Sequence, residues 1–259
     1  ESFLAVLDAF HDTQGALDFV LCRQEGGAAF MAAAWGKLTG QPGLCFVTRG
    51  PGATNAAIGV HTALQDSSPM LLFVGQVGTD MKGREAFQEV DYKAVFGGLA
   101  KWAVEIDDVD RLPEIVARAW KTALTGRPGP VVVALPEDML TARTSAPALP
   151  RLALPAEPAA PPEALSAARD MLAQAQRPLI FYGGATWSEA GQNALKAFAE
   201  DSDIPVVSVF RYQDMYDNTS PCFCGEAGVG MWPSVKALIR EADVILAINA
   251  RFGENSTDG

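Results

Sequence analysis

Residues 19–35 read FVLCRQEGGAAFMAAAW, an apolar run that leads into a carboxylate and then into a segment of small, uncharged residues. The run from Asp18 to Cys22 has the continuous apolar character of a strand covered on both faces. Residues 27–39 contain one charged side chain, Lys37, which predicts a helix packed against a protein interior. Glu25 stands where the two elements meet. Because burying an ionised carboxylate without a partner is costly, we expect a poorly solvated acid suited to proton transfer. The position also fits a carboxylate that caps free N–H groups at a helix start.

The next segment repeats the pattern of strand, glycine turn and helix. Residues 43–48 predict a buried strand, and the turn at 49–55 reads RGPGATN before an apolar helix at 56–64. Another apolar strand is predicted at 70–76. Glu25 and the Gly-Pro-Gly turn would then lie at the carboxyl ends of neighbouring parallel strands. Open α/β sheets bind ligands at that edge.

The whole chain alternates between strand and helix patterns, which predicts an α/β protein of two three-layer α/β/α domains with mainly parallel sheets. In the first half, strands are expected at 18–22, 43–48, 70–76, 100–106 and 130–135, and helices at 2–10, 27–39, 54–65, 92–96 and 112–124. In the second half, strands are expected at 178–182, 204–209 and 243–248, and helices at 163–174, 188–200 and 235–241.

A proline-rich stretch separates the two halves. It contains six prolines, at positions 147, 150, 155, 158, 161 and 162. Such a composition favours an extended, semi-rigid linker. We therefore predict a first domain at 1–145, a linker at 146–162 and a second domain at 163–259.

Composition excludes some classes of partner. The 259 residues carry a net charge of −11, which disfavours nucleic-acid binding because phosphate contacts need a basic surface. The longest apolar runs are too short to span a membrane. Four cysteines in a chain of this size fit a reducing compartment, and we expect a cytoplasmic protein. Cys222 and Cys224 lack the further ligands of a complete zinc site, so no metal site is predicted.

Seven segments together resemble the N-terminal part of thiamine-diphosphate-dependent enzymes of the acetolactate synthase-like family. The order and approximate spacing of these segments match the family across nearly the whole chain, although each is weakly specific alone. The segments are 23–28, 40–43, 47–55, 69–70, 75–77, 87–91 and 127–131.

The resemblance implies that the first domain binds the pyrimidine ring of thiamine diphosphate and that the second is the family's central domain. In the family a glutamate hydrogen-bonds the ring nitrogen opposite the exocyclic amine, and this activates the cofactor's C2 atom. Glu25 matches that glutamate. The implied roles are catalysis for Glu25, cofactor contact for Pro51, Gly52, Asn55 and Gln88, and substrate contact for Phe87.

Three departures from the family pattern bear on function. No Gly-Asp-Gly motif for Mg²⁺ and diphosphate occurs, so we expect both to bind through a further domain of a longer polypeptide. The family's usual Val/Ile-Pro-Gly turn before the first helix is absent. Glu137 stands where biosynthetic acetolactate synthases usually have Lys, Gln24 where they have His, and Gly26 where they have Gln. Glu137 and the short Gly183-Gly184 turn argue against FAD, whereas Arg127 and Arg251 match positions beside the flavin. FAD is therefore possible but not favoured.

The resemblance implies an enzyme that joins or cleaves a carbon–carbon bond next to the carbonyl of a 2-oxo acid, of the acetolactate synthase type. A 2-oxo-acid or acyl-CoA decarboxylase of the same superfamily is the alternative. Because the family's cofactor lies between two subunits, a homodimer or homotetramer is expected. This chain alone could instead be a non-catalytic dimerisation module.

Overall fold

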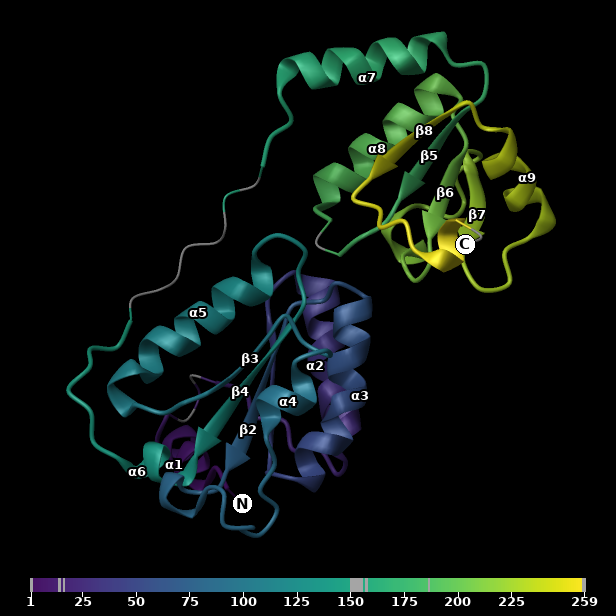
Figure 1. Cartoon of the computed structure of the whole chain (residues 1–259). Helices are drawn as coiled ribbons and strands as arrows, with labels where there is room; N and C mark the ends of the chain where they lie inside the picture. The colour runs from purple at the N-terminus through teal and green to yellow at the C-terminus, as the bar shows by residue number, and fades with distance from the viewer. Residues whose placement is uncertain are drawn as a thin grey trace. The chain divides into compact units, whose positions relative to one another are not determined.

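Two parallel sheets organise the protein, one in each of two units that the chain forms at residues 1–155 and 156–259. The computed structural model describes residues 2–13, 15, 17–149, 156, 158–185 and 187–257 (Figure 1). Most of the central part of the predicted linker, residues 150–155 and 157, lies outside these ranges.

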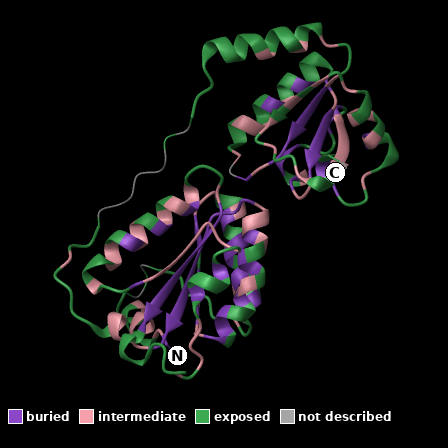
Figure 2. Cartoon of the chain, in the orientation of Figure 1, coloured by how far each residue is buried: buried purple, intermediate pink, exposed green. Residues whose placement is uncertain are grey.

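The first sheet has four parallel strands in the order β1-β2-β4-β3. They span β1 Gly43–Val47, β2 Met70–Gln76, β3 Trp102–Glu105 and β4 Pro130–Pro136. Every residue of β2 and β4 is buried, which agrees with the continuous apolar runs that predicted them (Figure 2).

Helices cover both faces of this sheet (Figure 1). One face packs against α2 (Glu25–Thr39), α3 (Pro51–Gln65) and α4 (Tyr92–Phe96), and the other against α5 (Leu112–Leu124). Along each strand, alternate side chains pack into the hydrophobic cores on the two faces of the sheet. For example, Leu72 faces α2 and α3, whereas Leu71 and Phe73 face α5. The short helix α1 (Leu4–Asp12) is held by aromatic contacts, with Phe10 edge-on to Phe46 at 5.6 Å.

Helix α2 lies unusually close to its neighbours because glycines occupy the contacts. A Cβ atom at Gly36 would lie 2.0 Å from the carbonyl oxygen of Pro69, and one at Gly59 of α3 would lie 2.4 Å from the Cβ of Ala29. A Cβ at Gly43, where β1 begins, would lie 2.0 Å from the carbonyl oxygen of Ala32. Small residues therefore set the depth at which α2 sits in the unit.

The prediction of a strand at 18–22 is wrong. These residues have no regular secondary structure and pair with no strand among the described residues. Phe19, Val20 and Leu21 are exposed, Leu21 by 84%. An apolar run indicates a capacity for burial, but a strand also needs a hydrogen-bonding neighbour, and residues 18–22 do not join β1, which is the edge of the sheet.

The second unit contains another parallel sheet, in the order β7-β6-β5-β8. Its strands are β5 Pro178–Tyr182, β6 Val206–Val209, β7 Phe223–Ala227 and β8 Val244–Ile248, and its helices are α7 Pro162–Gln174, α8 Glu189–Ser202, α9 Pro233–Glu241 and α10 Glu254–Thr257. The sequence did not predict β7. This edge strand reads FCGEA, with Gly225 at φ +123° beside a register shift, so it lacks an apolar pattern.

The remaining described elements are short, namely the helix α6 (Glu137–Thr141) and three 3₁₀ turns at Thr79–Met81, Val109–Arg111 and Gln213–Met215. Within the described ranges, no helix is both long enough and apolar enough to cross a bilayer. The expected class of two α/β domains with parallel sheets is confirmed.

Candidate functional site

Glu25 is the first residue of α2, two residues earlier than the predicted helix start. The residue before it, Gln24, caps the helix, because its side-chain oxygen accepts the N–H of Gly27 at 2.7 Å. The alternative role of Glu25 as the helix cap therefore falls to Gln24. The carboxylate of Glu25 is half-buried, and its Oε2 accepts a hydrogen bond from Asn55 Nδ2 at 3.1 Å.

The Gly-Pro-Gly turn brings the start of α3 next to this carboxylate. Gly50 has φ +56°, a conformation that favours glycine, and Pro51 occupies the first turn of α3. A Cβ atom at Gly52 would lie 2.8 Å from Thr48 Cγ2 and 3.6 Å from Glu25 Oε1. The absence of a side chain at Gly52 thus accommodates Thr48 and keeps the turn close to the second carboxylate oxygen.

Gln88 reaches the turn from the loop between β2 and α4. It holds φ +62°, which is uncommon for a residue other than glycine, and its Cβ would lie 2.9 Å from a Cβ at Gly50. The N–H of Gly50 donates to the hydroxyl of buried Tyr92 at 2.7 Å. Phe87 is 76% exposed.

The structure therefore brings Glu25, Gly52 and Asn55 into one cluster, with Pro51 in the same turn and Gln88 against Gly50. Phe87 precedes Gln88 on the same loop, and its side chain is exposed. The catalytic, cofactor and substrate roles of all six residues stay predictions.

Charged and polar groups around the turn were not predicted from the sequence. Arg49 Nη1 and Glu137 Oε1 form an ion pair at 2.6 Å. Burial raises the pKa of the Tyr92 hydroxyl, while its hydrogen bond to Gly50 and the charge of Arg49 act in the opposite direction. The partners in these contacts are distant in sequence, so no local pattern predicts them. The sequence marks these residues only by their position in or beside the segments that resemble the family.

Cys45 lies under the site in β1. Burial raises the pKa of its thiol to about 12, and the nearby Cys22 and Glu25 act in the same direction. It therefore behaves as a small apolar core residue. Cys22 is half-buried rather than part of a buried strand. Within the described part of the chain, no three His, Cys, Asp or Glu side chains gather as a metal site would require.

The cluster suits one face of a flat heterocyclic ring. Glu25 offers a carboxyl group that can share a proton with a ring nitrogen, Asn55 orients that carboxyl group, and Gly52 lets the turn lie close to it. These features fit the aminopyrimidine of thiamine diphosphate.

Comparison with known proteins identifies both units. Residues 1–95 match the thiamine pyrophosphate enzyme N-terminal TPP binding domain, and residues 165–259 match the thiamine pyrophosphate enzyme central domain. Thiamine pyrophosphate is another name for thiamine diphosphate.

Similar proteins include acetolactate synthase isozyme 2 large subunit of Escherichia coli, the acetolactate synthase large subunit of Parasynechococcus marenigrum, and the mitochondrial acetolactate synthase catalytic subunit of Saccharomyces cerevisiae. Each is 33% identical over 99% of this chain, which covers 46%, 43% and 39% of the three relatives respectively. The chain thus spans less than half the length of these relatives. With two domains of one enzyme family matched in order, the chain belongs to the thiamine pyrophosphate enzymes and is similar to their acetolactate synthases.

Proposed function

We propose that this chain supplies the pyrimidine-binding wall of a thiamine diphosphate site in an enzyme that acts on 2-oxo acids. The observation that carries the proposal is the cluster of Glu25, Asn55 and Gly52, in which a half-buried acid is oriented by an amide and lies beside the glycine turn. When bound, thiamine diphosphate supplies a carbon acid at C2 that adds to the substrate carbonyl once deprotonated.

Within this wall, Glu25 holds a proton between its carboxyl group and the ring nitrogen opposite the exocyclic amine. The hydrogen bond from Asn55 fixes the orientation of that carboxyl group. Glycines at 50 and 52 allow backbone to approach the ring, and Gln88, packed against Gly50, contacts the ring from the loop side. Phe87, exposed on the same loop, contacts the substrate.

Cofactor titration of this chain tests whether the anchor for the diphosphate lies outside residues 1–259. We expect residues 1–259 to bind thiamine diphosphate weakly or not at all by calorimetry, because the diphosphate and its Mg²⁺ supply the main charge-based anchor and this sequence has no Gly-Asp-Gly motif.

The matched comparison is the complete polypeptide that carries this chain, which should bind the cofactor only with Mg²⁺ present. Micromolar, Mg²⁺-dependent binding to residues 1–259 would show that the anchor lies within this chain. Absence of binding to the complete polypeptide would favour the alternative of a non-catalytic dimerisation module.

The acetolactate synthase type is the favoured reaction, supported by the similarity of the chain to acetolactate synthase subunits over 99% of its length. A 2-oxo-acid or acyl-CoA decarboxylase is the alternative within the superfamily. The observation in its favour is the set of replaced residues at Gln24, Gly26 and Glu137, which lie in or near the site elements. Product analysis with pyruvate separates ligation from decarboxylation of a 2-oxo acid, since ligation gives acetolactate and simple decarboxylation gives an aldehyde.

The exposed apolar surface of α2 and α3 supports a homodimer or homotetramer. Phe30, Met31, Trp35 and Leu38 of α2 are exposed, as is Ile58 of α3, although all are apolar. Contiguous exposed apolar side chains mark interaction surfaces, and a second subunit covering α2 would also desolvate Glu25 at its N-terminus.

Within the first unit, the charges of Glu137 and Arg127 neither favour nor disfavour flavin binding, because each is engaged by other residues. Glu137 is paired with Arg49, so its charge is compensated. Arg127 caps the end of α3, donating to the carbonyl of Gln65 at 3.3 Å and to Ser67 Oγ at 2.7 Å. The short Gly183-Gly184 turn after β5 therefore decides the proposal, and we expect the complete protein to be purified without FAD. A yellow preparation with near-stoichiometric flavin absorbance would contradict this.

We further propose a cytoplasmic protein with a small-molecule substrate and no nucleic-acid or membrane partner. The four cysteines are all free, as a reducing compartment would keep them. The net charge of −11 opposes binding to phosphate backbones and to anionic membrane surfaces.

A further inference from the structure

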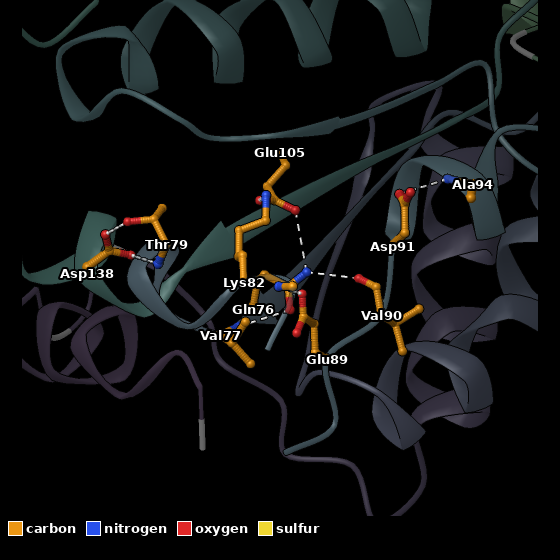
Figure 3. Close-up of polar contacts among 11 residues, drawn as sticks. Gln76, Val77, Thr79, Lys82, Glu89, Val90, Asp91, Ala94, Glu105 and Asp138 are labelled. Atoms are coloured by element: carbon orange, nitrogen blue, oxygen red, sulfur yellow. Dashed lines mark hydrogen bonds and ion pairs between the residues drawn. The ribbon is translucent and has the colours of Figure 1, made fainter. Parts of the chain in front are cut away.

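The loop between β2 and α4 carries Gln88 and Phe87, and its two ends are pinned to the sheet. At the base, the buried side chain of Gln76 donates from Nε2 to the carbonyl of Val90 at 2.9 Å and accepts the N–H of Val77 at 3.0 Å (Figure 3). Just beyond the loop, Asp91 caps α4 by accepting the N–H of Ala94 at 3.1 Å. Both ends of the loop are thus fixed.

Two further contacts hold the outgoing half of the loop from outside. Asp138 of α6 accepts the N–H of Thr79 at 3.1 Å. Lys82 forms an ion pair with Glu105 at the end of β3, and the side chain of Glu105 is only 12% exposed (Figure 3). The hydrogen bond to Glu105 raises the pKa of Lys82. Burial acts in the opposite direction, and the negative charges of Glu89 and Asp91 add to the rise. The loop is therefore tied to the sheet as far as Lys82.

The returning half needs a separate support, because its backbone is in an unusual conformation. Gly83, Glu85 and Gln88 all have positive φ, at +73°, +55° and +62°. Glycine tolerates this region, whereas Glu85 and Gln88 adopt it only where surrounding contacts determine it.

Glu89 provides that support from within the loop. Its Oε1 accepts the N–H of Gly83 at 2.8 Å and its Oε2 that of Ala86 at 3.4 Å, while its own N–H donates to the carbonyl of Ala86 at 3.0 Å. The carboxylate thus accepts two backbone N–H groups, an arrangement that favours a negative charge. These hydrogen bonds hold residues 83–86 close to the segment that carries Gln88.

We propose that Glu89 is a positioning residue of the cofactor site, whose carboxylate folds the loop so that the adjacent Gln88 is held against Gly50. This inference rests on the proposed function, because Gln88 matters only if the Gly50 turn binds thiamine diphosphate. Glu89 itself acts through Gln88.

The first test concerns loop order in this chain. Hydrogen exchange of peptides covering residues 83–88 should become at least about tenfold faster in Glu89→Ala, since hydrogen bonds to a charged group are among the stronger ones. Glu89→Gln should lie between, because its amide oxygen can still accept the N–H of Gly83. Glu85→Ala, which removes an exposed carboxylate of the same loop, is the matched control and should leave exchange unchanged. Unchanged exchange in Glu89→Ala overturns the proposal.

The second test concerns the cofactor in the complete polypeptide. Glu89→Ala should raise the apparent dissociation constant of thiamine diphosphate by about tenfold at saturating Mg²⁺, with partial recovery in Glu89→Gln. Faster exchange with an unchanged cofactor constant overturns positioning and leaves the proposed function intact. If the unsubstituted polypeptide does not bind thiamine diphosphate, the proposed function fails, and the positioning role fails with it.

Discussion

Glu25→Gln in the complete polypeptide should lower turnover by about 100-fold or more, the usual scale for a positioned acid–base group. Gln keeps the shape of the side chain and can still accept the hydrogen bond from Asn55 Nδ2, but it cannot give up or share a carboxyl proton. The direct measurement is exchange of the C2 proton of bound thiamine diphosphate in deuterated water, which should slow in parallel with turnover.

Stability and cofactor binding separate this chemical effect from a structural one. Gln24 rather than Glu25 caps α2, so the melting temperature of Glu25→Gln should match that of the unsubstituted protein. Glu85→Gln, at an exposed carboxylate, serves as the control for charge removal. Near-normal C2 proton exchange in Glu25→Gln would show that another group activates the cofactor.

Gly36→Ala should destabilise the first unit by about 2 kcal/mol or more, the scale of overpacking a close contact. The added methyl carbon would lie 2.0 Å from the carbonyl oxygen of Pro69, a backbone atom just before β2 that cannot rotate away. The better helix propensity of alanine offsets only about 1 kcal/mol of this cost. Urea titration followed by hydrogen exchange of β1 and β2 peptides measures the first unit separately from the second.

Gly27→Ala is the matched control in the same helix. Its Cβ would meet nothing closer than Gln24 Oε1 at 3.8 Å, so the propensity term acts alone and should stabilise the unit by up to about 1 kcal/mol. Equal effects of the two substitutions would mean that α2 can shift away from Pro69 at little cost.

The strands of the first unit were predictable where burial alone defines them. β2 and β4 are covered on both faces, and their apolar runs show it. The run at 18–22 has the same character yet forms no strand, because composition reports a tendency to bury and carries no information about an available neighbour. β7 fails in the opposite way, since hydrogen bonding to β6 makes a strand of a polar, glycine-containing segment.

The candidate site was predictable as a set of residues but not as a set of contacts. Resemblance placed Glu25 and Asn55 in two separate matching segments, and the structure joins them by a hydrogen bond. The supports of the site are interactions between distant positions, such as Gly50 with Tyr92 and Arg49 with Glu137. No local pattern marks such partners. Both helix starts were placed late because a glutamine cap and a first-turn proline extend α2 and α3 toward the site.

The strand order of the first sheet has a consequence for synthesis on the ribosome. β4 is the last strand of this unit to be translated, yet it lies between β2 and β3. Until β4 emerges, β2 therefore has one open edge, and β3, although already translated, has no strand to pair with. During this interval the nascent chain offers a template for unwanted strand pairing, which ends only when β4 fills the place between β2 and β3.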